Sequence, residues 1–263
     1  MSVFHAALLG LVQGLCEFLP VSSSGHLVLL QNIFGIAEGA LFFDTMLHLG
    51  TLFAVVFAFR KTLWEMIRHP FRKYPMFIVL ATVPAVVFTL LFRDFIEGSY
   101  SGSLLGWGFL VTALLLTVTD RLSARVAGKR RIDGMRAGHA LLIGAAQGLA
   151  VFPGVSRSGS TISGGLFCSL EREFAAEFAF MMSIPAILGA TVLQVKDVLE
   201  VGIGSVDWIP VLVGMAVAFV SGLFAIRWMM KIVKKGKLGW FALYTAILGV
   251  LVLIDRYATH LFF

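Results

Sequence analysis

The chain has 263 residues, of which 59% are hydrophobic and only 14% are charged, and its mean hydropathy is +0.92. Soluble domains carry about 25% charged residues, so this composition excludes a soluble protein. It predicts an all-α polytopic membrane protein, a single integral membrane domain over residues 1–263 with the lipid bilayer as its surroundings. The net charge of +6 is not gathered on a soluble basic face, which excludes a nucleic-acid partner.

Two apolar stretches are interrupted and do not have the form of simple membrane spans. Residues 3–36 break at Pro20 and the serines that follow, and residues 138–170 break at Pro153 and Gly154. Each arm is about 12 to 17 residues long, which is marginal for crossing about 30 Å of hydrocarbon. Broken helices at membrane depth are tolerated only where protein or a water-filled cavity surrounds them. We therefore predict two re-entrant helix–loop–helix hairpins.

Six uninterrupted apolar stretches, three between the two hairpins and three after the second, predict six transmembrane helices. They cover about residues 43–59, 75–92, 103–119, 174–195, 208–230 and 239–254. Basic residues are concentrated in the loops after the first span, after the third span, and between the fifth and sixth spans. The positive-inside rule places these three loops in the cytoplasm. Six spans with two hairpins satisfy every loop.

The two interrupted stretches are related in sequence. Gln13–His26, QGLCEFLPVSSSGH, and Gln147–Ser160, QGLAVFPGVSRSGS, are identical at eight of fourteen positions. Three predicted spans lie between the copies, and an odd number inverts the second copy relative to the first. This pattern predicts an inverted-topology repeat, with repeat 1 at about residues 1–120 and repeat 2 at about 138–258, whose broken helices meet near the membrane midplane.

The two loops hold the polar residues of an otherwise apolar chain. Gln13 and Glu17 are four residues apart and share a helix face. Hydroxyl, imidazole and guanidinium groups crowd the helix starts that follow, at Ser22, Ser23, His26, Ser156, Arg157, Ser158, Ser160 and Thr161. Helix N-termini bind phosphate through their free N–H groups, and an arginine fork suits phosphate oxygens. These groups together are suited to hydrolysing a phosphate ester or anhydride.

Structural interpretations compete with this one for single residues. Glycine and serine runs in membrane helices commonly serve close packing, and Arg157 could be a buried counter-ion to Glu17. The joint occurrence of these groups in two paired loops favours a functional site. Asp44 and His48 lie near an outer edge of the first span, and we expect them to be outside the site.

Both motifs resemble those of a known family, the undecaprenyl-diphosphate phosphatases of the bacitracin-resistance type. QGLCEFLPVSSSGH is similar to the family's (E/Q)xxxE segment followed by PVSSxGH, and PGVSRSGST is similar to its PGxSRSxxT segment. The resemblance covers essentially the whole chain. It implies hydrolysis of the polyprenyl lipid undecaprenyl diphosphate to undecaprenyl phosphate at the periplasmic face of the bacterial inner membrane. That reaction recycles the lipid carrier for cell-wall synthesis and confers resistance to bacitracin.

The resemblance also implies roles for individual residues. The implied catalytic residues are Glu17, Ser23, His26 and Arg157, and the implied phosphate-binding residues are Gln13, Ser22, Ser156, Arg157, Ser158 and Thr161. The nucleophile stays open among Ser23, His26 and water. The family is associated with Mg²⁺ or Ca²⁺, yet members often have Glu where this chain has Gln13. Glu17 alone is a thin metal site, so we expect any cation to be shared with the substrate diphosphate.

Two other functions are consistent with part of the pattern. Inverted repeats with broken helices are typical of transporters, and a fold does not determine a function, so a polyprenyl-phosphate lipid transporter or flippase is the alternative. The SSGH segment is similar to a motif of the type-2 phosphatidic acid phosphatases, but this chain lacks that family's K-x6-RP segment. The sequence leaves open whether copies of the chain form a homo-oligomer.

Overall fold

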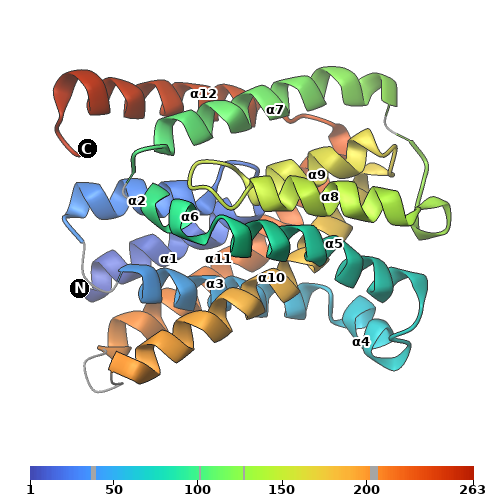
Figure 1. Cartoon of the computed structure of the whole chain (residues 1–263), viewed down its shortest axis with the longest axis horizontal. Helices are drawn as coiled ribbons and strands as arrows, with labels where there is room; N and C mark the ends of the chain where they lie inside the picture. The colour runs from blue at the N-terminus through green and yellow to red at the C-terminus, as the bar shows by residue number, and fades with distance from the viewer. Residues whose placement is uncertain (37–39, 101, 127, 202–206) are drawn as a thin grey trace.

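The fold is a bundle of helices, seen in a computed structural model that describes residues 1–36, 40–100, 102–126, 128–201 and 207–263. The described part is helical almost throughout and contains no β-strand (Figure 1). The helices, in chain order, are α1 (Val3–Phe18), α2 (Ser23–Phe34), α3 (Ala40–Ala58), α4 (Arg60–Arg68), α5 (Lys73–Leu91), α6 (Arg93–Ser99), α7 (Leu105–Val126), α8 (Ala137–Leu149), α9 (Arg157–Phe167), α10 (Arg172–Val201), α11 (Trp208–Lys235) and α12 (Gly239–Ile254).

The six predicted spans are confirmed as helices α3, α5, α7, α10, α11 and α12. Within the described residues, five of them are long and apolar enough to cross a membrane individually. The sixth span is α3 joined to α4, a pair bent by 80° at Phe59. The chain is therefore a polytopic membrane protein.

Helix α4 is a feature that we did not predict, because its nine residues follow the first span in what reads as a basic loop. It exposes Trp64 and Ile67 on the surface, and the guanidinium of Arg68 lies 4.8 Å from the centre of the Trp64 ring. Its other side packs Leu63 and Met66 against the core. A short helix with exposed aromatic and basic side chains is typical of one lying in a membrane interface.

Both predicted hairpins are confirmed, with their breaks at the predicted positions. Helix α1 ends at Phe18 directly before Leu19 and Pro20, and α2 begins at Ser23 after Ser22 with a φ of 68°. Helix α8 ends at Leu149, and α9 begins three residues after Gly154, whose φ is 90°. Proline ends the backbone hydrogen bonding of the first arm, and glycine takes up the left-handed turn of the second loop.

The two hairpins enter the bundle from opposite ends, and their loops lie near its middle (Figure 1). The first arm of each hairpin packs against a span of the other half, since α1 packs against α11 and α8 packs against α5. Small residues permit these close approaches. A Cβ on Gly14 would lie 2.5 Å from the carbonyl oxygen of Ala218, and a Cβ on Gly144 would collide with the carbonyl oxygen of Ala81. This exchange of partners agrees with the predicted internal repeat.

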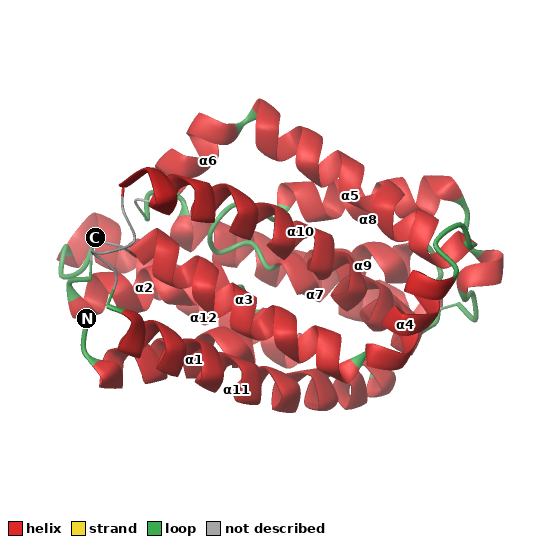
Figure 2. Cartoon of the chain, turned by 90° about the horizontal axis from the view of Figure 1, so that it is seen from below, coloured by secondary structure: helices red, strands yellow, loops and turns green. Residues whose placement is uncertain are grey.

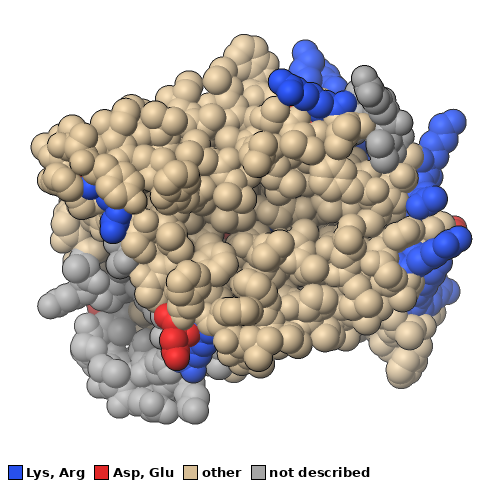
Figure 3. Space-filling view, turned by 45° about the horizontal axis from the view of Figure 1, so that its top comes forward, with Lys and Arg blue, Asp and Glu red and all other residues tan. Residues whose placement is uncertain are grey.

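The three basic loops meet at one end of the bundle. Lys73 Nζ donates to the Asp133 carbonyl oxygen at 2.7 Å, and Lys234 Nζ lies 2.7 Å from Glu173 Oε1. Lys and Arg side chains gather at this end of the molecule (Figure 3), whereas both termini lie at the end opposite α4 (Figures 1 and 2). This distribution has the polarity that the positive-inside rule requires.

The close packing of α8 against α5 can be tested with substitutions of glycines on α8. We expect Gly144→Ala to lower the thermal stability of the protein in detergent by about 1 to 3 kcal/mol, since the added methyl group overpacks against Ala81. Gly138→Ala is the matched control, because a Cβ at Gly138 meets nothing within 4 Å. Equal melting temperatures for the two variants would show that α8 is not closely packed at Gly144.

Candidate active site

Each hairpin loop ends in a helix N-terminus that is capped by a serine. Ser22 Oγ accepts a hydrogen bond from the Gly25 N–H at 3.3 Å, and Ser156 Oγ accepts one from the Gly159 N–H at 3.0 Å. The two serines occupy equivalent positions of the sequence repeat. The first N–H groups of a helix have no partner inside it, so both helix starts can present N–H groups to an anion.

The two loops touch each other directly. Ser158 Oγ donates to the Leu19 carbonyl oxygen at 3.0 Å. A Cβ on Gly25 would lie 2.9 Å from Gly154 Cα, so only hydrogen atoms separate the two backbones there. This contact confirms the expectation that the loops of the two hairpins face each other.

Glu17 lies at the centre of the site and is 5% exposed. Its Oε2 accepts hydrogen bonds from Ser23 Oγ at 2.6 Å and from Gln13 Nε2 at 3.0 Å. Its Oε1 is paired with Nη2 of Arg157, which comes from the second hairpin. The structure thus brings together four of the predicted site residues, from both copies of the repeat, around one carboxylate.

His48 also belongs to this cluster, and our expectation that it lies outside the site is wrong. Its Nδ1 is 3.2 Å from Glu17 Oε2 and 2.8 Å from Gln13 Nε2. The available signal was an ionisable residue inside a membrane span, which is a functional candidate by default. Asp44, one turn earlier on α3, is separate from the cluster and accepts a hydrogen bond from Gln31 Nε2 at 2.6 Å.

His26 is held beside the cluster by a different set of contacts. Its Nδ1 lies 2.7 Å from the Ser22 carbonyl oxygen, which can only accept, so Nδ1 carries the proton. Its Nε2 then accepts a hydrogen bond from the Tyr244 hydroxyl at 2.7 Å. The Tyr244 ring stacks on the imidazole, and the Phe109 ring meets it edge-on. Among the described residues no hydrogen bond or ion pair joins His26 to Glu17.

Tyr244 and Thr112 are positioning residues that we did not predict from the sequence. Thr112 Oγ1 donates to the Gly154 carbonyl oxygen at 2.8 Å and accepts a hydrogen bond from the Ser156 N–H at 2.9 Å. Helix α7 thereby fixes the second loop, as Tyr244 of α12 fixes His26. Each lies in a long, mostly apolar span, and no motif marks either one.

The hydroxyl groups predicted to bind phosphate already have protein partners. Ser22 and Ser156 cap their helices, and Ser158 Oγ is bound to Leu19. Thr161 Oγ1 donates to the Arg157 carbonyl oxygen at 2.8 Å. In this conformation these groups shape the loops, and their contact with phosphate stays a prediction.

The space next to Glu17 is small. A cavity of about 10 Å³ lies between Glu17, Arg157 and Thr161 on one side and Phe180 and Ser183 of α10 on the other. A space of this size holds about one water molecule, so this conformation is closed and a phosphate bound here requires the cavity to widen.

The site residues do not form a metal site by themselves. Both carboxylate oxygens of Glu17 contact protein side chains, one of them the cationic Arg157. The described part of the chain contains no group of three His, Cys, Asp or Glu residues placed to hold a metal ion. Divalent Mg²⁺ and Ca²⁺ need several oxygen ligands, and Glu17 cannot supply them while it is paired with Arg157.

Comparisons with known proteins agree across almost the entire chain. The model of one protein family, described as bacitracin resistance protein BacA, matches residues 6–251. An undecaprenyl-diphosphatase from Carboxydothermus hydrogenoformans is 47% identical over 257 residues, which is 97% of each chain. An undecaprenyl-diphosphatase from Alkaliphilus metalliredigens is 42% identical over 97% of this chain and 98% of its own. Undecaprenyl-diphosphatase 4 of Bacillus thuringiensis is 41% identical over the full length of both chains.

The hydrogen bonds of Thr112 generate a prediction about the second loop. We expect Thr112→Val to destabilise the protein by about 1 to 3 kcal/mol, because it leaves the buried Ser156 N–H and Gly154 carbonyl without a partner. Thr112→Ser keeps the hydroxyl and is the control. Thermal unfolding in detergent measures both, and a Val variant as stable as the Ser variant would contradict the role given to Thr112.

Proposed function

The chain belongs to the bacitracin resistance protein family and hydrolyses undecaprenyl diphosphate, and we propose that Ser23, Glu17 and Arg157 carry out this hydrolysis. The product is the lipid carrier that is reused in cell-wall synthesis. The alternative of a lipid transporter is not favoured by these relatives. The observation that carries the mechanism is the 2.6 Å hydrogen bond from Ser23 Oγ to Glu17 Oε2.

Ser23 is the nucleophile in this scheme, and Glu17 is the base that activates it. Ser23 Oγ attacks the terminal phosphorus, its proton passes to Glu17, and the bond between that phosphorus and the bridging oxygen breaks. Undecaprenyl phosphate leaves at this step. Water then attacks the phosphoserine, inorganic phosphate is released, and the proton held by Glu17 returns to Ser23 Oγ.

Arg157 links substrate binding to the activation of Ser23. In the closed conformation its guanidinium is paired with Glu17. A diphosphate offers the same guanidinium several anionic oxygens in a geometry suited to a bidentate contact. When Arg157 turns from Glu17 to the phosphate, the carboxylate is free to accept the proton of Ser23. The N-termini of α2 and α9 stabilise the charge that develops on the phosphoryl oxygens.

His26 serves the second step better than the first. Both of its ring nitrogens are hydrogen-bonded, to the Ser22 carbonyl and to Tyr244, which disfavours direct attack by the imidazole. Its Nε2 is the one ring nitrogen that carries no proton. We assign this atom as the acceptor of the proton of the water that attacks phosphoserine. The proton reaches Nε2 through the Tyr244 hydroxyl, which already donates to it, and His26 then releases a proton to solvent.

The proposal also covers the side of the membrane from which the site is reached and the way in which a cation is bound. The first hairpin opens at the end opposite the basic loops, which supports a site reached from the periplasmic side of the inner membrane. The relatives support a membrane lipid diphosphate as substrate. Because the protein side chains do not hold Mg²⁺ or Ca²⁺ unaided, we propose that a required cation arrives bound to the diphosphate.

Phosphate release from undecaprenyl diphosphate by purified protein tests the scheme. We expect Ser23→Ala and Arg157→Ala each to lower kcat by about 100-fold or more. Arg157→Lys keeps the charge but not the fork, and we expect it to recover only part of the rate. Near-normal turnover of Ser23→Ala would show that water, and not Ser23, attacks the phosphorus. Near-normal turnover of Arg157→Ala would refute the role assigned to Arg157.

A second measurement addresses His26 through its partner. We expect Tyr244→Phe to lower kcat roughly tenfold, the value of one hydrogen bond, with little change in KM and a displaced limb in the pH–rate profile. Tyr257→Phe is the control, since Tyr257 is exposed at the end of the chain. An unchanged rate and pH profile for Tyr244→Phe would contradict a role of His26 in proton transfer.

A further inference from the structure

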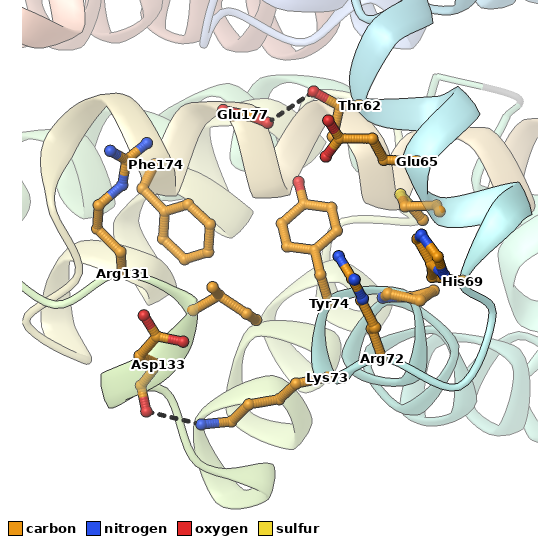
Figure 4. A pocket seen from close by; sticks show the side chains of 13 residues that line it. Thr62, Glu65, His69, Arg72, Lys73, Tyr74, Arg131, Asp133, Phe174 and Glu177 are labelled. Atoms are coloured by element: carbon orange, nitrogen blue, oxygen red, sulfur yellow. Dashed lines mark hydrogen bonds between the residues drawn. The ribbon is translucent and has the colours of Figure 1, made fainter.

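A second and larger cavity lies at the end of the bundle that carries α4 and the basic loops, and it shares no lining residue with the closed space beside Glu17 (Figures 1 and 4). Its volume is about 640 Å³, within the range of about 300 to 1,000 Å³ that is typical of ligand sites. Its walls come from α4, the first turn of α5, the connection between α7 and α8, and the start of α10. None of its lining residues belongs to the active site.

One part of this cavity is acidic and contains a buried hydroxyl that has no hydrogen-bond partner. Glu177 Oε1 accepts a hydrogen bond from Thr62 Oγ1 at 3.3 Å, and the Glu65 carboxylate lies beside them (Figure 4). The hydroxyl of Tyr74 points into the cavity toward these groups, is buried, and has no hydrogen-bond partner. Two carboxylates and an unpartnered hydroxyl form a suitable environment for an ammonium group, which supplies three N–H donors.

Two arginines flank this acidic part from different sides, Arg131 on the side of Phe174 and Asp133 and Arg72 on the side of Tyr74 and His69 (Figure 4). Arg131 uses Nε for an ion pair with Glu171 at 3.2 Å. Among the described residues no carboxylate or carbonyl oxygen is bound to the guanidinium of Arg72. Such guanidinium groups are the usual ligands of phosphate oxygens.

We propose that this cavity binds the headgroup of an aminophospholipid, a phosphate diester that carries a primary amine. The amine lies against Glu65, Glu177 and the Tyr74 hydroxyl, and the phosphate lies against Arg72. A headgroup with both charges matches a cavity lined by both carboxylates and guanidinium groups better than a simple anion, which the carboxylates would repel.

The surroundings of the cavity favour a membrane lipid over a soluble phosphoamine. Helix α4, which forms one wall, exposes Trp64 and Ile67 on its surface, with Arg68 over the Trp64 ring. Side chains of this kind lie at the level of lipid headgroups. The acyl chains of a bound lipid can therefore remain in the membrane while its headgroup occupies the cavity.

Thermal stability of the full chain in detergent, with defined lipids added, tests this site. We expect dioleoyl phosphatidylethanolamine to raise Tm by about 5 °C at a hundredfold excess over its Kd. Dioleoyl phosphatidylglycerol lacks the amine, and dioleoyl phosphatidylcholine lacks its N–H donors, so both should raise Tm much less. An equal rise with phosphatidylglycerol would overturn the proposal in favour of a simple anion site. An equal rise with soluble phosphoethanolamine would overturn the assignment to a lipid.

Variants locate the effect within the cavity. We expect Tyr74→Phe and Glu177→Gln to lose most of the preference for phosphatidylethanolamine, because they remove the groups that face the amine. Glu173→Gln is the matched control, since Glu173 lies on the same helix but pairs with Lys234 outside the cavity. If Glu177→Gln fails to fold, Tyr74→Phe decides the question. A full preference in Tyr74→Phe would overturn the site.

Discussion

The buried carboxylate of Glu17 is the constraint on which the rest of the structure depends. An isolated charge in a low-dielectric interior is costly unless it is paired and hydrogen-bonded. Glu17 comes from the first hairpin, and its charge is balanced by Arg157 from the second. Gln13, Ser23 and His48 supply its remaining contacts. The two hairpins must therefore stay in contact at their loops, and the same contacts that stabilise the carboxylate place it against the hydroxyl that it activates.

Close helix packing is what makes this meeting of loops possible. Backbone touches backbone between Gly25 and Gly154, and Gly14 and Gly144 let α1 and α8 approach spans of the opposite half. Without a hydrophobic driving force inside the membrane, such small-residue contacts supply much of the helix association. One consequence of this tight packing is a closed site, since the cavity beside Glu17 has a volume of only about 10 Å³. Substrate binding must separate groups that hold the resting protein together.

The two copies of the repeat have divided the chemistry between them. The first copy has Glu17 and His26 where the second has Val151 and Ser160, and the second has Arg157 where the first has Ser23. Gln147 is a residue that the second copy retains without the partner that its equivalent has in the first copy. It is equivalent to Gln13 and is buried, but among the described residues neither atom of its amide has a hydrogen-bond partner. Its counterpart binds Glu17, and no carboxylate stands at the matching position of the second copy.

The sequence by itself determined the six spans, the two broken hairpins and the grouping of Gln13, Glu17, Ser23 and Arg157. Hydropathy, chain-breaking residues and the internal repeat are local properties, and they can be read before any helix is packed. Only the tertiary structure decided that His48, Thr112 and Tyr244 support the site and that α4 turns away from α3 by 80°. The physical reason is that no motif surrounds these three residues on their spans. Which face of a span meets the loops depends on how α3, α7 and α12 pack against their neighbours, and no spacing along the chain encodes that rotation.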